Sequence, residues 1–233
     1  MLPVAHAQQG GWGEWVIAKS NLPELLEKEL CALERAGRLE AVTVFMSSAT
    51  DPYQGLERRL ELSRRSLERF RRHRIRRLLV QTRSPMVERD IELLGALEGS
   101  LIVSITLETD DESVRRALTP TSSSVERRLR TCARLRDAGI FVQVAIAPMM
   151  PNHPARFAEM VAQVSDRVVL DTYFEGDGAS GRRSRALGVG ELYGRLGYAG
   201  WFKPGAEREL LAALRSRMGH DRVLFSRSGF NAV

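Results

Sequence analysis

AVTVFMSSATDPYQGLE, residues 41–57, is the stretch that decides the fold of this chain. An apolar, β-rich run ends in small hydroxyl side chains, and an aspartate, a proline turn and the start of a charged helix follow it. This order is typical of a parallel strand, because α/β sheets and barrels bind ligands on the loops that follow their strands. We therefore expect residues 47–51 to lie on a ligand-binding face.

The same alternation of strand and helix repeats along the chain. Continuous apolar runs bounded by turns favour a parallel sheet that is buried on both faces. Serial βα units of this kind form either an open doubly wound sheet or a barrel. The expected strands are residues 15–19, 41–46, 77–82, 100–106, 140–147 and 167–174, with a short strand-like segment at 223–226.

Capping residues support the predicted helices between these strands. Asn21 is an N-cap candidate before a helix with proline in its first turn, and Gly37 closes that helix. A later helix places Leu129, Cys132 and Leu135 on one face. The predicted helices are residues 23–37, 87–99, 124–139 and 205–219, and the glycine-rich part at 177–201 is expected to form loops and short helices.

The bulk composition is that of an ordinary soluble protein. The chain has 233 residues, 43% hydrophobic and 27% charged, which is enough for one large α/β domain with a sizeable core. No apolar run is long enough for a transmembrane helix, which needs about 18 residues or more. The first residues lack the basic and apolar regions of a secretory signal, so the expected location is the cytoplasm.

Arginine dominates the positive charge. The formal net charge is +6, and two explanations stand open: an arginine-rich genome, or a surface for nucleic acid or another anionic ligand. The densest basic run is residues 64–77. Because Leu60, Leu67 and Phe70 indicate an apolar helix face there, we expect most of these arginines on its solvated side.

Several kinds of chemistry lack support in the sequence. Dinucleotide, P-loop and nucleophile-elbow motifs do not occur, and the four histidines are scattered. The two cysteines, Cys31 and Cys132, lie in helix-like segments with no metal-ligand spacing. We therefore predict core positions for both cysteines and no metal site built by this chain alone.

Polar side chains gather where the strands end. Thr82 and Ser84 follow one strand, Ser104 lies in the next, and hydroxyl groups on neighbouring strands can hydrogen-bond a polar, nucleoside-sized ligand. Any one of these hydroxyls can instead cap the helix that follows. The set is therefore more informative than its members.

Four segments, taken in order, resemble the radical S-adenosylmethionine superfamily, and in particular the branch of spore photoproduct lyase and its relatives. The most specific elements are TDPYQ (50–54) with Glu57 three residues on, TRSPMVERD (82–90) and IAPMMP (146–151). The resemblance covers about residues 14–175, and residues 176–233 form an extension of one domain that spans residues 1–233.

The resemblance implies a fold, two cofactors and a set of binding residues. The fold is a partial TIM barrel of serial βα units with parallel strands. A [4Fe-4S] cluster reductively cleaves S-adenosylmethionine and starts radical chemistry, here of the lyase or repair type, while the protein binds and positions the reactants. The residues that match ligand-binding positions are Ser47, Ser48, Thr50 and Asp51 near the methionine amino group, Thr82, Ser84 and Ser104 near the ribose and carboxylate, Arg128 near the carboxylate, and Ile146 and Ala147 along the adenine.

One part of the family pattern does not occur in this sequence. The family holds its cluster with Cys-x3-Cys-x2-Cys after the first barrel strand, just before the segment that matches WVIAKSN (15–21). The chain has neither the motif nor that first strand. Three thiolates leave one iron open for S-adenosylmethionine, so we expect the chain as written not to perform the radical reaction.

Two explanations stay open. The sequence is the carboxyl-terminal part of a longer protein, which is favoured because a barrel without its first strand has an exposed edge. Alternatively it is a cluster-free relative that binds a nucleoside or a nucleic acid. An S-adenosylmethionine-like ligand is the expected partner, nucleic acid is a weaker one, and the sequence indicates neither a substrate nor an oligomeric state.

Overall fold

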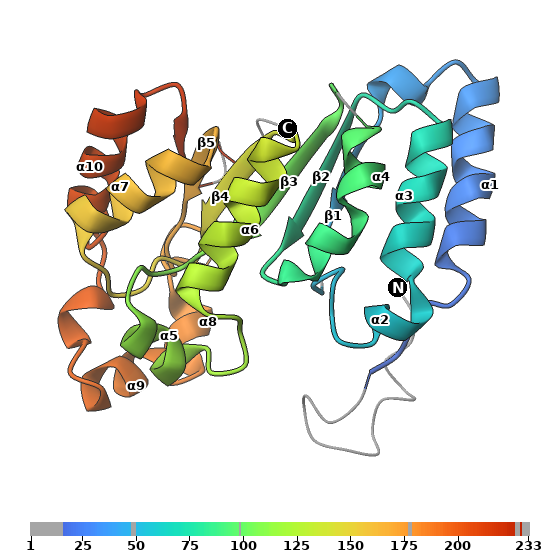
Figure 1. The fold of residues 1–233 in the computed structure, drawn as a ribbon. Helices are drawn as coiled ribbons and strands as arrows, with labels where there is room; N and C mark the ends of the chain where they lie inside the picture. The colour runs from blue at the N-terminus through green and yellow to red at the C-terminus, as the bar shows by residue number, and fades with distance from the viewer. Residues whose placement is uncertain (1–15, 48–49, 98, 177–178, 227–228, 230–233) are drawn as a thin grey trace.

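The structure, a computed structural model, describes residues 16–47, 50–97, 99–176, 179–226 and 229. Its centre is one sheet of six strands, whose spatial order is their order along the chain and whose neighbours all pair in parallel (Figure 1). The strands are β1 (Thr43–Met46), β2 (Arg77–Thr82), β3 (Leu101–Thr106), β4 (Val142–Ile146), β5 (Arg167–Leu170) and β6 (Val223–Phe225).

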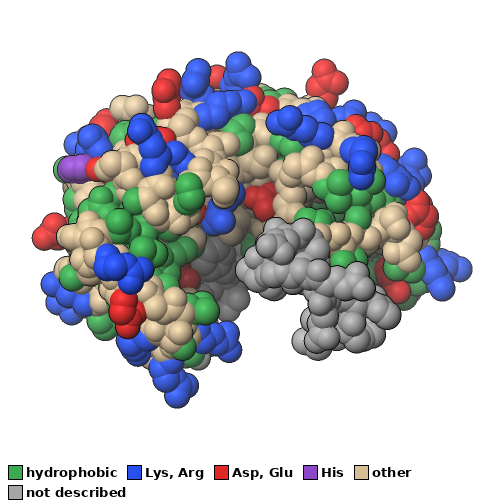
Figure 2. All heavy atoms as spheres, turned by 90° about the horizontal axis from the view of Figure 1, so that it is seen from below, with side chains coloured by type: hydrophobic (Ala, Val, Ile, Leu, Met, Phe, Trp, Pro, Cys, Tyr) green, Lys and Arg blue, Asp and Glu red, His purple; other side chains and the backbone are tan. Residues whose placement is uncertain are grey.

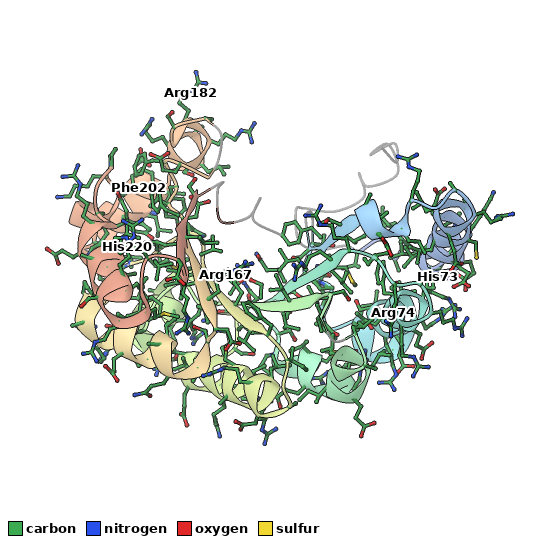
Figure 3. All side chains as sticks on the ribbon, turned by 90° about the horizontal axis from the view of Figure 1, so that it is seen from above. His73, Arg74, Arg167, Arg182, Phe202 and His220 are labelled. Atoms are coloured by element: carbon green, nitrogen blue, oxygen red, sulfur yellow. The ribbon has the colours of Figure 1, made fainter. Side chains whose placement is uncertain are left out.

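The sheet is curved, and the longer helices lie along its outer side, as the view down the strands in Figure 3 shows. This arrangement confirms the predicted partial barrel of serial βα units. None of the described helices is long and apolar enough to cross a membrane. The helices are α1 (Leu22–Arg35), α2 (Glu57–Leu60), α3 (Leu62–Arg72), α4 (Ile91–Gly95), α5 (Glu112–Leu118), α6 (Val125–Asp137), α7 (Pro154–Val164), α8 (Arg182–Ala186), α9 (Val189–Arg195) and α10 (Arg208–Met218), with 3-10 turns η2 (Leu39–Ala41), η3 (Pro85–Asp90) and η4 (Ala199–Trp201).

The predicted strand at 15–19 is wrong for its described residues. Residues 16–19 have no regular secondary structure, and Trp15 lies outside the described part of the chain. Val16 and Ile17 are 62% and 59% exposed. Strand preference depends on packing against neighbours, and these β-branched side chains gain no such packing within the described residues.

The ends of the predicted helices agree with the structure only in part, since the segment expected as one helix at 87–99 is the 3-10 turn η3 followed by α4, which ends at Gly95. Ser124 caps α6, since its hydroxyl oxygen accepts a hydrogen bond from the Arg127 N–H at 3.2 Å. Gly37 follows α1 with φ of +64°, a left-handed conformation that ends helices at low cost. Asn21 does precede α1, but its side chain makes no capping hydrogen bond.

Side chains alternate between the two faces of the sheet. On the outer face, Val80, Val103, Val144 and Val168 are fully buried against the helices, which confirms the continuous apolar strands. Leu135 and Cys132 of α6 are buried in the same core, as predicted. The helices also contribute Leu30, Leu67, Phe70, Leu94, Phe157, Val161, Leu210 and Leu214.

The inner face carries what we call the inner polar row: Gln81, Ser104, Gln143 and Arg167. These residues are neighbours in register on β2, β3, β4 and β5. Their side chains are hydrogen-bonded in sequence, at 3.5 Å, 3.0 Å and 2.8 Å, and Ser104 and Gln143 are fully buried. Figure 3 labels Arg167 beside the strands, at one end of this row.

The arginine-rich run at 64–77 has two parts. Leu67 and Phe70 are buried, which confirms the apolar face of α3. Arg64 pairs with Asp90 at 2.6 Å, Arg69 lies 3.4 Å from Glu27, and Arg65 pairs with a glutamate of α1. The exposed part is Arg71, Arg72, Arg74 and Arg76. Only the first two lie on α3, so the expectation that most arginines of the run line the solvated side of a helix is wrong.

The glycine-rich part folds as the predicted loops and short helices, and aromatic rings hold it. Tyr173, just after β5, packs edge to face against Tyr193 of α9, with ring centroids 6.0 Å apart. Phe202 contacts both rings, with centroids 5.5 Å and 5.8 Å away. These contacts attach residues 182–202 to the end of the sheet.

Glu88 joins η3 to α6. Its carboxylate accepts hydrogen bonds from Arg134 Nη1 and Thr131 Oγ1, each at 2.7 Å, and also pairs with Arg127. Burial raises the pKa of Glu88, but the hydrogen bonds from these three side chains outweigh it and lower the pKa to about 2. The charged form of Glu88 therefore stabilises the fold.

We expect Glu88→Gln to lower the free energy of unfolding by about 1–3 kcal/mol at pH 7. The folded pKa lies below that of an unfolded glutamate, about 4.3, so this contribution is complete above that value. It should fade as the pH falls toward 2, and the variant and the parent should then converge. Urea denaturation between pH 7 and pH 3 measures the difference. Glu92→Gln, at an exposed position of α4, is the control, and a difference that does not change with pH contradicts the prediction.

Candidate functional site

All the strands end on the lower side of Figure 1. Figure 2 looks onto this carboxyl-end face. In barrels and open α/β sheets, ligands bind at this end of the strands. The polar residues that follow the strands therefore form the candidate site.

Asp51 ties the loop after β1 to the end of β2. Its Oδ1 accepts hydrogen bonds from Thr82 Oγ1 at 2.6 Å and from the Tyr53 N–H at 2.8 Å. Its Oδ2 accepts one from the Arg83 N–H at 2.9 Å. The fold thus brings Asp51 and Thr82 together, and both carboxylate oxygens are used to shape the face.

The other predicted residues of this region have varied surroundings. Ser47 ends β1 with φ of +122°, a region that few residues other than glycine adopt. Thr50 is exposed, and Ser48 lies outside the described residues. Ser84 caps η3, because its Oγ accepts a hydrogen bond from the Met86 N–H at 3.3 Å. Of the two roles expected for strand-end hydroxyls, ligand binding and helix capping, the contact that Ser84 makes in the structure is the cap.

Residues of two family motifs, the segment 50–57 and the segment 82–90, form one hydrogen-bonded network. Tyr53 donates a hydrogen bond to Asp90 Oδ2 at 3.1 Å, and Arg89 lies 2.9 Å from Asp90 and 3.0 Å from Glu57. Glu57 also accepts a hydrogen bond from the Ser63 N–H at 3.0 Å, in the first turn of α3. Burial, followed by the charge of Asp90, raises the pKa of Tyr53, so its hydroxyl stays protonated and donates.

Glu108 follows β3 and lies between two arginines. Arg128 of α6 donates from Nη1 to Glu108 Oε2 at 2.7 Å and to the Thr106 carbonyl at 2.8 Å. Arg83 Nη2 lies 2.9 Å from Glu108 Oε1. Glu108 and Arg128 are buried, and the side chain of Arg83 is 46% exposed. The face therefore has a buried negative charge with a positive charge on each side.

Arg128 has spare hydrogen-bonding capacity. Its Nε and Nη2 are buried and have no hydrogen-bond partner within the described residues. A buried donor without an acceptor is unfavourable by about 1–3 kcal/mol. A guanidinium binds carboxylates and phosphates well, so this residue suits an anionic group of a ligand.

The loops after β3 and β4 are bonded to each other. The Met150 N–H donates to the Glu108 carbonyl at 2.9 Å, and Thr109 Oγ1 donates to the Pro151 carbonyl at 2.5 Å. Asp110 accepts hydrogen bonds from the His153 N–H at 2.9 Å and from Arg156 Nε at 2.6 Å. The segment IAPMMP is thereby held against the end of β3.

Three further predicted residues differ in orientation. Ser104 faces the inner side of the sheet, in the inner polar row, two positions before β3 ends. Ile146 is packed in the core between the sheet and the helices, and its carbonyl accepts a hydrogen bond from the Asp171 N–H at 2.9 Å. Ala147 follows β4 and is partly exposed.

The cysteines do not fit an iron–sulfur cluster. Cys132 is fully buried in the core, where burial raises the pKa of its thiol to about 12. Cys31 lies on α1 and is only partly buried, so the predicted core position is wrong for this cysteine. A cluster needs three thiolates, and this sequence contains two cysteines on different elements.

A cavity of about 520 Å³ lies at the opposite end of the sheet. Arg77, Phe141 and Arg167, at or just before the beginnings of their strands, are among its lining residues. It is therefore separate from the candidate site at the carboxyl ends.

These features define an open α/β barrel with a polar, arginine-containing ligand face. The chain belongs to the radical SAM superfamily, whose family model matches residues 10–164. The resemblance in the sequence motifs is thus confirmed at the level of the family.

Two curated relatives are uncharacterized proteins. The chain is 29% identical to one from Methanocaldococcus jannaschii, over 61% of this chain and 51% of the relative. It is 28% identical to one from Acidianus two-tailed virus, over 66% of this chain and 48% of the relative. The chain therefore spans about half the length of the curated relatives it matches.

Solved structures of spore photoproduct lyase have a similar fold. A variant of that enzyme with bound AdoMet and dinucleoside spore photoproduct superimposes with a TM-score of 0.58 and 12% identity. The match covers 88% of this chain and 66% of the lyase chain. At this identity the likeness supports the partial barrel and nothing more specific.

We expect Asp51→Asn to lower the free energy of unfolding by about 1–3 kcal/mol, because an amide replaces a charged acceptor of three hydrogen bonds. The amides of Tyr53 and Arg83 should exchange with deuterium faster in the variant. Asp137→Asn, at an exposed position of α6, is the control. Equal stability of the two variants would contradict this assignment.

The two cysteines should differ in reactivity. The thiolate is the reactive form, and the raised pKa of Cys132 keeps its thiol protonated at pH 8. Iodoacetamide should therefore modify Cys31 in the folded chain, and Cys132 only after unfolding in guanidinium. Peptide mass spectrometry measures both rates, and early modification of Cys132 would show that it is not buried.

Proposed function

We propose that the carboxyl-end face of this chain binds S-adenosylmethionine. Membership of the superfamily supports this ligand, and the observation that carries the proposal is the buried guanidinium of Arg128 with two unpartnered nitrogens. The carboxylate of the methionine part is an acceptor of matching charge and shape. The ligand would lie at the ends of β1, β2 and β3, beside Arg128.

Arg128 and the residues around it have different roles in the proposed binding. Arg128 receives the carboxylate, and Glu108 keeps the guanidinium oriented by holding its Nη1. Asp51 and Thr82 do not need to contact the ligand, because their mutual hydrogen bond positions the loop after β1. Arg83 balances the charge of Glu108, so that the ligand carboxylate meets a net positive site.

The cluster of the superfamily supplies the electron that cleaves S-adenosylmethionine. The residues of this chain do not fit that cluster, so we derive no radical step from them. Reductive cleavage, and any lyase or repair reaction, is proposed only for a form of the protein with three suitable thiolates. Binding of the ligand is the function proposed for the 233 residues themselves.

Nucleic acid is a less favoured ligand. The exposed arginines at 71, 72, 74 and 76 lie at and beyond the carboxyl end of α3, where β2 begins, and Figure 1 places this end of the helix opposite the carboxyl-end face. A nucleic acid on those arginines would therefore not reach the candidate site directly. We do not propose a nucleic-acid function for this surface.

Isothermal titration calorimetry with three ligands tests the proposal. S-adenosylmethionine should bind, and decarboxylated S-adenosylmethionine should bind about 10–100-fold more weakly, because it lacks the hydrogen bonds to a charged group. Methylthioadenosine, which lacks the whole amino-acid part, should bind no better than the decarboxylated ligand. Equal affinity for the first two ligands, or no heat at millimolar concentration, would exclude the proposed mode.

Arg128→Lys supplies the matched variant. A lysine retains the charge beside Glu108 but lacks the Nε and Nη2 donors of the guanidinium. The ratio of the affinities for S-adenosylmethionine and its decarboxylated form should therefore fall toward one. Arg130→Lys, an exposed position on the same helix, should leave the preference unchanged. Thermal denaturation of each variant establishes that it is folded before its affinity is measured.

A further inference from the structure

A second group of ligand-type side chains lies far from the carboxyl-end face, between α1 and α3. Glu27 and Cys31 are one turn apart on α1, and His73 follows the last residue of α3. One ligand atom from each residue lies within 4.8 Å of the other two. Figure 3 labels His73 at the edge of the molecule beside these helices.

The distances suit one small divalent ion. His73 Nε2 lies 3.3 Å from Glu27 Oε1 and 3.9 Å from Cys31 Sγ. A tetrahedral zinc ion has bonds of about 2.3 Å to sulfur and about 2.0–2.1 Å to nitrogen or oxygen, which places its ligand atoms roughly 3.3–3.7 Å apart. Small rotations of the side chains would therefore suffice to hold the ion.

Glu34 fixes the orientation of the imidazole. Its Oε2 lies 3.1 Å from His73 Nδ1, on the side of the ring away from the other two ligands. A carboxylate in this position accepts the Nδ1–H, which leaves the lone pair of Nε2 directed at Cys31 and Glu27. Metal-binding histidines in proteins are held by the same kind of partner. His73 is only 6% exposed, so the ring is also held by packing.

The local charges are consistent with a bound ion. A thiolate on Cys31 and the carboxylate of Glu27 together balance a divalent cation. Arg69 Nε lies 3.4 Å from the other oxygen of Glu27, so this carboxylate already has one cation beside it. The alternative is a protonated His73 paired with Glu27 and Glu34, in which Cys31 has no role beyond its contact at 3.9 Å.

We propose that Glu27, Cys31 and His73 form a binding site for Zn²⁺ or a similar divalent transition-metal ion, with a fourth position open to water. A mixed sulfur, nitrogen and oxygen ligand set selects such ions over Mg²⁺ and Ca²⁺. The ion would link α1 to α3 and stabilise the fold in proportion to its concentration. The sequence alone predicted no metal site, because Cys31 and His73 are 42 residues apart and only the fold brings them together.

Titration of the untagged full chain with Co²⁺ tests the site directly. One equivalent should give the intense visible absorption of a tetrahedral cobalt ion and a near-ultraviolet band from thiolate ligation. Zn²⁺ should then displace the cobalt and remove both signals. Zn²⁺ should also protect Cys31 from iodoacetamide and raise the melting temperature of the chain.

The variants separate coordination from folding. Cys31→Ser should abolish the thiolate band, and Glu34→Gln should weaken Zn²⁺ binding about 10–100-fold while keeping one ion per chain. His220→Asn, at an exposed position outside the site, should retain both signals. Melting curves in the presence of a chelator should match those of the parent, so that a lost signal reports a lost ligand.

Two results would overturn the proposal. One is the absence of the cobalt bands from the folded parent chain at a few equivalents of metal. The other is a spectrum and affinity that Cys31→Ser leaves unchanged. Either result would make His73 a histidine that is held by ion pairs alone.

Discussion

The buried ion pair between Glu108 and Arg128 is the interaction on which the carboxyl-end face depends. Two charges removed from water need close pairing and further hydrogen bonds, and loss of one partner from such a pair typically destabilises a protein by about 3–5 kcal/mol. The chain meets this need in part, with the Thr106 carbonyl, with Arg83 and with the loop after β4, which is bonded to the Glu108 backbone. Two nitrogens of Arg128 still have no partner within the described residues. The ends of three strands are thereby arranged around one charge.

The family motifs in this part of the chain support the scaffold of the site. Tyr53, Glu57, Arg89 and Asp90 contact one another and the start of α3, and Asp51 holds the end of β2. Their residue types are explained by these contacts without any ligand. These motif residues therefore shape the carboxyl-end face through contacts within the chain itself.

The pattern of apolar residues along the sequence predicted the elements that are determined by residues close together in the chain. The apolar runs identified β2 and β3 to within one residue, and the spacing of Cys132 and Leu135 identified the buried face of α6. The run at 15–19 failed, because apolar content does not reveal whether a neighbouring strand exists. The contacts of Arg128 with Glu108, and of His73 with Cys31, were equally out of reach, because they join residues that only tertiary packing makes neighbours.

The inner polar row has a direction. Arg167 can only donate, so Gln143 turns its carbonyl oxygen toward β5 and its amide nitrogen toward Ser104. The hydroxyl of Ser104 then donates onward to Gln81. Every donor along the row therefore points the same way across the strands, from β5 toward β2. The orientation of the buried Gln143 amide and of the Ser104 hydroxyl is thus set by a single arginine at one end of the row.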